Sequence, residues 1–282
     1  MAVMETINYY LVHQPMISTF NYTHGTTAFS TVTALVLTVL VYLSATLLFS
    51  TTAAIPSLPP PLLRRISAAH NILILLLSFT MALGATLSAV SQSPSLHWVF
   101  CFPANRTLPR GPVFFWGYVF YLSKILEFID TLLIILGGTK SSRRLSFLHV
   151  YHHAMVVVMC YIWLETSQSL FIIALITNVS VHTVMYAYYL MCSLGIRPSW
   201  KRFVTDVQIV QFVFSFVVSL VMLYYHFTQF ECSGFKGWCF NAVFNASLLY
   251  LFIDFHSKNY KNKKRRKKTV EKVGDDDDDK VV

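Results

Sequence analysis

Blocks of about twenty apolar residues alternate with short polar segments along most of the chain. A helix needs about twenty residues to cross a hydrocarbon layer of ~30 Å, so each block predicts one membrane-spanning helix. Seven such spans are expected, at Ala28–Phe49, Ile66–Val90, Val113–Leu136, Phe147–Leu164, Ser169–Met191, Phe203–Phe227 and Trp238–Phe255. The predicted fold class is therefore an all-α integral membrane protein with seven transmembrane helices.

Composition supports the same class, because 55% of the residues are hydrophobic and only 12% are charged. Soluble domains carry roughly twice that share of charge. The connections are too short for a second domain, so residues 1–257 are expected to form one membrane domain. Residues 258–282 hold a basic block and then an acidic run, which predicts a disordered tail.

The positive charges predict the orientation of the spans. With the N-terminus in the lumen, 18 of the 22 Lys and Arg residues lie on the cytosolic side, and the C-terminus is cytosolic. The glycosylation sequons at Asn21 and Asn105 then both lie in the lumen, where they can be modified. Cys101, Cys232 and Cys239 are lumenal as well. Cys101 is expected to pair with Cys232, with Cys239 as the alternative partner and free thiols as a further alternative.

Four spans carry polar side chains that are expensive in hydrocarbon. The groups are KILEFIDT in the third span, HVYHH in the fourth, NVSVHTVMYAYYL in the fifth and TDVQIVQ at the start of the sixth. The predicted topology brings all four to one depth near the cytosolic side, which indicates a single polar site. The lumenal halves of the same spans read as apolar. The pattern therefore predicts a chamber with a polar mouth and apolar walls, suited to an amphiphile whose aliphatic tail points inward.

The histidine box HVYHH admits two chemistries. His149, His152 and His153 share one helix face and could ligate a metal with help from Glu127 and Asp130. Membrane desaturases, however, use several such boxes, and only one occurs in this sequence, with Lys124 competing for the carboxylates. A nucleophilic imidazole fits better, because an acyl-imidazole is an activated acyl donor. We therefore expect no metal and no cofactor.

The four groups resemble the K-x-x-E-x-x-D-T, H-x-x-H-H, H-x-x-M-Y-x-Y-Y and T-x-x-Q-x-x-Q motifs of ELO-type fatty acid elongases, in family order across residues 124–211. The resemblance implies an endoplasmic-reticulum very-long-chain 3-oxoacyl-CoA synthase. Such an enzyme condenses acyl-CoA with malonyl-CoA and releases CO2 and CoA. It also implies six helices forming a barrel around a closed-ended substrate tunnel, with the first span outside.

Roles follow by motif position. The resemblance implies that His152 accepts the acyl group, that His182 contacts the substrate carbonyls, and that His149 and His153 orient the imidazole or move protons. Lys124, Glu127 and Asp130 would hold the charged layer together. The expected substrate-binding residues are Asn178, Tyr186, Tyr189, Gln208 and Gln211, and, for the CoA phosphates, Arg197, Lys201, Arg202 and Lys258. The remaining histidines are expected to lie off this common layer or in loops and to be structural, namely His13, His24, His70, His97, His226 and His256.

The expected partners are acyl-CoA, malonyl-CoA, membrane lipid and the other enzymes of the elongation cycle. A homo-oligomer is compatible with the sequence, and no nucleic-acid partner is expected. Two alternatives stay open at this point: an iron-dependent membrane desaturase or hydroxylase, and a seven-span receptor or transporter.

Overall fold

The structure is a computed structural model that describes residues 2–51, 57–138 and 145–258. The predicted disordered tail lies almost entirely outside these residues. Every regular element in the described part is a helix. The short N-terminal elements are α1 (Ala2–Asn8), η1 (Tyr9–His13) and α2 (Pro15–Ser18), and α5 (Leu96–Phe100) is short as well. The long elements are α3 (Val32–Thr51), α4 (Pro60–Gln92), α6 (Pro112–Leu126), α7 (Phe128–Leu136), α9 (Phe147–Glu165), α10 (Phe171–Ser193), α11 (Lys201–Thr228) and α12 (Phe235–His256).

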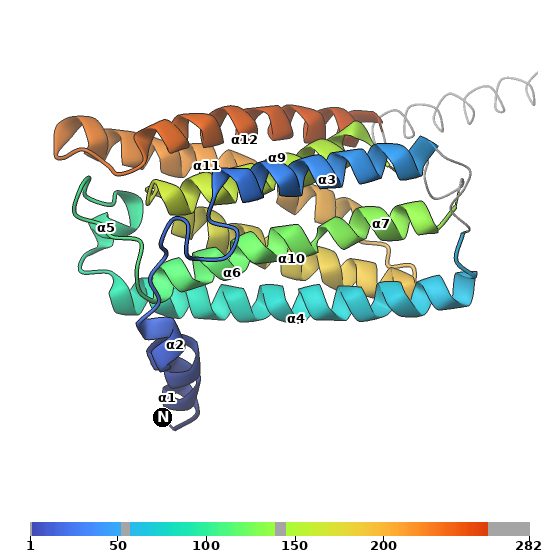
Figure 1. The fold of residues 1–282 in the computed structure, drawn as a ribbon, viewed down its shortest axis with the longest axis horizontal. Helices are drawn as coiled ribbons and strands as arrows, with labels where there is room; N and C mark the ends of the chain where they lie inside the picture. The colour runs from blue at the N-terminus through green and yellow to red at the C-terminus, as the bar shows by residue number, and fades with distance from the viewer. Residues whose placement is uncertain (1, 52–56, 139–144, 259–282) are drawn as a thin grey trace, which may run out of the picture.

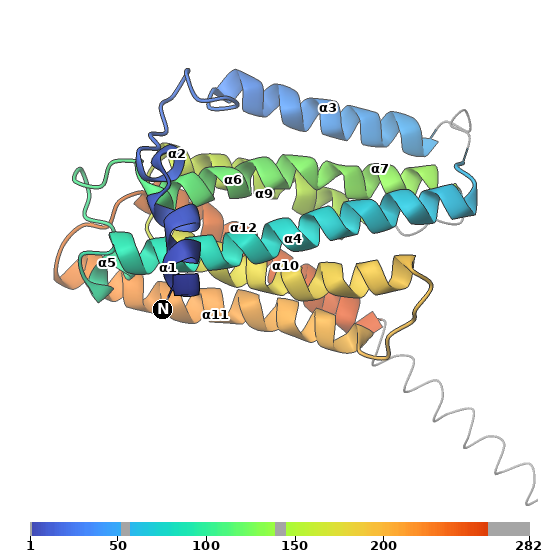
Figure 2. The same ribbon diagram turned by 90° about the horizontal axis from the view of Figure 1, so that it is seen from below.

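Six of the long helices among the described residues are long and apolar enough to cross a membrane, namely α3, α4, α9, α10, α11 and α12. Their bounds agree with the predicted spans to within a few residues, except that α4 begins six residues earlier than expected. The predicted third span, Val113–Leu136, is not one helix. It is divided between α6 and α7, which follow one another along one line in Figure 2.

The division falls at Glu127, where ψ is −11°, away from the usual helical value. Glu127 N–H still donates to the Ser123 carbonyl, four residues earlier as in an α-helix, but Asp130 N–H donates to the Glu127 carbonyl only three residues earlier. The side chain of Glu127 is fully buried and bonded to Lys124 one turn earlier. The break therefore coincides with the polar group that the sequence predicts for this span.

The long helices lie roughly side by side, with their axes along the length of the molecule (Figure 1). Six of them form a closed ring of contacts, in which each helix packs against the next. The order is α4, α6, α9, α12, α11, α10 and back to α4. Helix α3 stands apart from these six in Figure 2 and contacts α7 and α9. Gly84 of α4 lets the Trp116 ring of α6 pack directly against the α4 backbone, because a Cβ there would lie 2.2 Å from that ring.

One end of the molecule, at the left of Figure 1, is tied by a disulfide between Cys101 and Cys232, the pair favoured from the sequence. We call this the disulfide end. Free cysteines among the described residues are Cys160, Cys192 and Cys239. At the same end the Tyr22 hydroxyl donates to Glu165 of α9 at 2.7 Å, and His24 lies 3.1 Å from the same carboxylate. Burial, and then this hydrogen bond, raise the pKa of Tyr22 above its usual value.

Candidate active site

The polar site is built around a buried ion pair on α6 and its junction with α7. Lys124 Nζ donates to Glu127 Oε1 at 2.7 Å, and both side chains are only 1% exposed. His182 of α10 joins this pair, with its Nδ1 3.4 Å from both Lys124 Nζ and Glu127 Oε1. The ammonium also lies 4.5 Å from the Phe120 ring centroid, a cation–π geometry. Three predicted site residues from two helices are therefore in direct contact.

Asp130 forms a second polar contact group with α10 and α4. Tyr186 donates to Asp130 Oδ2 at 2.5 Å, and His70 Nε2 lies 3.0 Å from Asp130 Oδ1. The sequence predicted that His70 lies off the polar layer and is structural. Its contact with Asp130 shows that the predicted position is wrong. Its span begins at the same end as the histidine box, so the depth argument used for the other four groups would have found it.

The histidine box begins α9, where the hydroxyl of Ser146 caps the helix by accepting from His149 N–H. The three rings are close to one another: the centroids of His149 and His153 are 4.4 Å apart, and those of His152 and His153 are 5.5 Å apart. Their environments differ. His149 Nε2 is held 2.8 Å from the Thr131 hydroxyl, whereas the Nδ1 atoms of His152 and His153 are both buried without a hydrogen-bond partner within the protein.

His152 lines a small cavity of about 30 Å³ between α9, α10, α11 and α12. Asn178 and Gln211, two residues predicted to bind substrate, line it as well. The lining is mixed. The apolar members are Val156, Met159, Ala174, Phe212, Phe244 and Leu248, and the others are His152, Trp163, Thr177, Asn178, Gln211, Ser215, Asn241 and Asn245. The prediction of purely apolar walls toward the disulfide end is therefore wrong for this cavity, because α12 contributes two asparagines that the sequence argument left aside.

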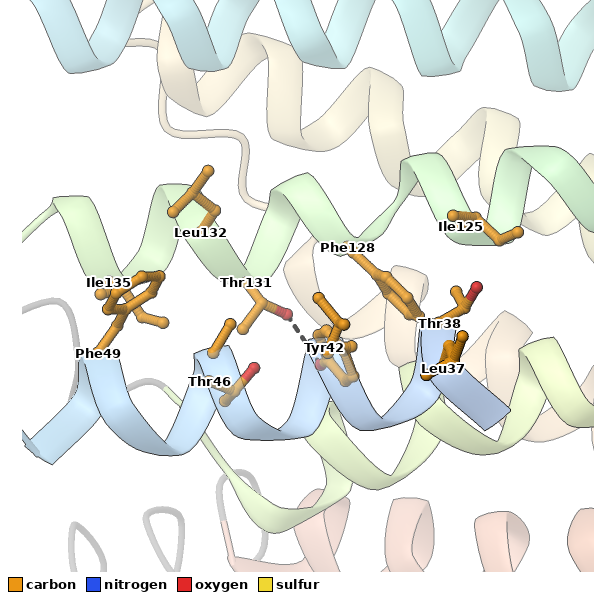
Figure 3. A pocket seen from close by; sticks show the side chains of 12 residues that line it. Leu37, Thr38, Tyr42, Thr46, Phe49, Ile125, Phe128, Thr131, Leu132 and Ile135 are labelled. Atoms are coloured by element: carbon orange, nitrogen blue, oxygen red, sulfur yellow. Dashed lines mark hydrogen bonds between the residues drawn. The ribbon is translucent and has the colours of Figure 1, made fainter. Parts of the chain in front are cut away.

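A second hollow, a groove of about 490 Å³, lies between α3 and the α6–α7 line (Figure 3). Its surface is apolar apart from a few hydroxyls. The Tyr42 hydroxyl lies 3.0 Å from Thr131 Oγ1, the same oxygen that contacts His149. Helix α3 is thus linked to the histidine box through one threonine.

Other predicted residues lie at the edge of this site or outside it. Tyr189 stacks edge-on against Tyr186 but is 41% exposed, and Gln208 donates to the sulfur of Met185. The four basic residues predicted for CoA are exposed at the end opposite the disulfide.

Two of those basic residues already have carboxylate partners. Arg202 lies 3.5 Å from Asp206, and Lys258 lies 2.7 Å from Asp254. The contact with Asp254 raises the pKa of Lys258. Arg197 and Lys201 are therefore the better placed of the four to meet an incoming anion.

The metal alternative receives no support from the donor geometry. In the ranges that the structure describes, no three His, Cys, Asp or Glu side chains are placed to hold one metal ion. His182 is held beside a lysine ammonium at 3.4 Å, and a cation in that position would be repelled by it.

The fold and the site together define a multi-pass helical membrane protein with a buried histidine, lysine and carboxylate site beside an internal cavity. The ELO family model, described as the GNS1/SUR4 family, matches residues 27–268. The chain therefore belongs to the ELO family and is a fatty acid elongase, a condensing enzyme.

Similar proteins include the "Fatty acid elongase 3-like" protein of Arabidopsis thaliana, 29% identical over 94% of this chain and 95% of its own length. "Fatty acid elongase A" of Dictyostelium discoideum is 35% identical over 69% of this chain and 71% of its own length. "Very long chain fatty acid elongase 2" of Mus musculus is 32% identical over 71% and 68%. No solved structure matches the chain.

Proposed function

We propose that this elongase is a very-long-chain 3-oxoacyl-CoA synthase that carries the acyl group on His152. The observation that carries the proposal is the position of His152. It is the histidine of the box that lines the internal cavity, and its Nδ1 has no hydrogen-bond partner within the protein. His149 is instead held by Thr131, which suits an orienting role. The length class is also the one in the printed name of the mouse relative.

The reaction would proceed in two steps. An imidazole nitrogen of His152 attacks the thioester carbonyl of acyl-CoA, and the CoA thiolate leaves. Malonyl-CoA then loses CO2, and its enolate carbon attacks the acyl-imidazole, which forms the new C–C bond and releases the imidazole. The Lys124–Glu127 pair holds His182 in a fixed orientation, from which it can contact the carbonyl oxygens as negative charge develops on them.

The cyclic packing of α4, α6, α9, α12, α11 and α10 supports a six-helix barrel, with the cavity between four of its helices, α9 to α12. In this arrangement α6 and α7 together form the third of seven spans, and α3 lies outside the barrel. The substrate tunnel would close toward the disulfide end, where the interior is filled by large side chains such as Phe102, Phe114 and Phe171. His153 would serve in proton transfer, because its ring contacts both the His149 ring and the His152 ring.

We place the enzyme in the endoplasmic reticulum with the disulfide end in the lumen. The disulfide itself and the exposed sequon residues Asn21 and Asn105 support this orientation, since both asparagines lie at that end. CoA phosphates would then meet Arg197 and Lys201 on the cytosolic side, with Arg202 and Lys258 around them. The other enzymes of the elongation cycle remain the proposed protein partners.

The test uses purified full-length protein, labelled malonyl-CoA and a long-chain acyl-CoA, without iron or reductant. We expect labelled 3-oxoacyl product from the wild type and none from His152→Ala. His97→Ala, which removes an exposed histidine near the disulfide end, should retain the activity and serves as the matched control.

A second readout identifies the acyl carrier. Incubation with acyl-CoA alone should leave the acyl group on the peptide that contains His152, detected by mass spectrometry. Condensation by His152→Ala at the wild-type rate would exclude this histidine as the carrier.

A further inference from the structure

The cavity beside His152 contains more polar atoms than a hydrocarbon chain requires. Three atoms besides His152 Nδ1 are buried there without a hydrogen-bond partner within the protein: Trp163 Nε1, Asn178 Oδ1 and Asn241 Oδ1. They come from α9, α10 and α12, and the Asn241 side chain is only 6% exposed overall. Buried polar groups are nearly always hydrogen-bonded, so three exceptions around one cavity point to a polar guest.

The unpartnered atoms restrict the chemistry of that guest. The indole N–H of Trp163 can only donate, whereas the two amide oxygens can only accept. A carboxylate would face the two oxygens without a donor, and an ammonium group could not accept from the indole. A hydroxyl group both accepts and donates, so it can accept from the Trp163 indole and donate to one of the two amide oxygens.

The depth of Asn241 follows from two contacts between α9 and α12. Tyr151 OH and Ser247 Oγ are 2.8 Å apart, and a Cβ on Gly237 would lie 2.8 Å from Ile162. The two helices therefore run antiparallel, and Asn241 lies level with positions 157–158 of α9. With a rise of 1.5 Å per residue, this level is about 8 Å beyond His152 toward the disulfide end.

We propose that this polar side of the cavity binds a hydroxyl group carried by the acyl chain itself, so that the elongase selects hydroxyacyl-CoA substrates. The inference rests on the proposed function, because it takes His152 as the acyl carrier and places the hydroxyl about 8 Å further along the chain. The free space of about 30 Å³ admits a water-sized group, so the rest of the chain enters by displacing side chains such as the flexible Met159. A saturated chain would leave the three polar atoms unpartnered.

The test compares acyl-CoAs of equal length in the condensation assay: one saturated, and a series of monohydroxy isomers with the hydroxyl at successive carbons. For the wild type we expect kcat/KM to peak at one or two adjacent hydroxyl positions, roughly ten- to hundredfold above the saturated chain. Asn241→Leu replaces the acceptor by an apolar group. It should lower kcat/KM for the preferred isomer and raise it for the saturated chain, so that their ratio falls toward one.

Two further variants make the result specific. Trp163→Phe retains most of the ring and removes the N–H donor, so it should lower the same ratio even if Asn241→Leu does not fold. Val243→Leu alters the 73% exposed outer face of α12 and should leave the positional preference unchanged.

Three outcomes would overturn the inference. One is a wild type that condenses every isomer equally well. Another is a ratio that neither Asn241→Leu nor Trp163→Phe changes. A third is that Asn241→Leu condenses the saturated substrate faster than the wild type does, while the wild type shows no preference for any hydroxyl position. That result would identify water as the guest. In all three the wild type still condenses acyl-CoA, so the proposed function stands; a wild type without condensation overturns both.

Discussion

Removing one partner of the Lys124–Glu127 pair should destabilise the protein far more than removing both. Each side chain is 1% exposed, and Lys124→Met leaves the Glu127 carboxylate buried with only the 3.4 Å contact to His182. Loss of one member of a buried ion pair costs about 3–5 kcal/mol, because the remaining charge stays desolvated. Replacing both residues, as Lys124→Met with Glu127→Leu, removes that uncompensated charge.

Thermal unfolding of the detergent-purified variants measures the difference. A loss of 1 kcal/mol lowers Tm by about 2–4 °C for a chain of this size, so Lys124→Met should lower Tm by about 6–20 °C. The double variant should recover more than half of that loss. Lys236→Met removes an exposed lysine at the disulfide end and should stay within about 2 °C of the wild type. If the double variant unfolds at as low a temperature as Lys124→Met, the desolvated carboxylate is not the cause and the reasoning fails.

Three further predictions concern other contacts. Cys101→Ser opens a crosslink with a sequence separation of 131, for which the chain-entropy model gives about 5 kcal/mol; a Tm that reductant leaves unchanged would contradict it. The pKa of Tyr22 is raised above 10.0 in the folded state, so the stability that its protonated hydroxyl contributes is complete below about pH 10 and declines above it. The Tm of the wild type, relative to that of Tyr22→Phe, should therefore be lower at about pH 11 than at about pH 8. A Tm difference that does not change with pH would count against the hydrogen bond to Glu165. His70→Ala leaves Asp130 without its 3.0 Å partner and should cost about 1–3 kcal/mol, partly restored in His70→Asn; equal Tm values would show that this contact is not stabilising.

The spans were predictable because length and apolarity alone decide whether a helix can cross a membrane. The break at Glu127 was not, since KILEFIDT contains neither proline nor glycine and reads as continuous helix. The cause is tertiary: the carboxylate is drawn into the pair with Lys124 and the contact with His182, both inside the protein. Periodicity along one segment cannot report a partner on another helix.

The site residues were predictable where several polar residues occur close together in one span. They were harder to predict where a span contains a single polar residue. His70 is a single histidine in an apolar helix, so only its contact with Asp130 reveals its place. Asn241 and Asn245 lie in the uncharged middle of α12, and their meaning depends on the facing residues Trp163 and Asn178. Which face of α12 points inward is set by packing, which the sequence of that helix alone does not specify.

The disulfide also sets an order of events during biosynthesis. Cys101 lies between α5 and α6, and its partner is 131 positions later, after α11. At about 5–20 residues per second, Cys101 waits about 7–26 s for Cys232 to be synthesised. During that interval α6, α9, α10 and α11 must enter the membrane with the thiol still reduced. The bond is therefore a late covalent closure of an assembly whose helices are already inserted, and premature oxidation of Cys101 would trap the chain before α12 completes the packing.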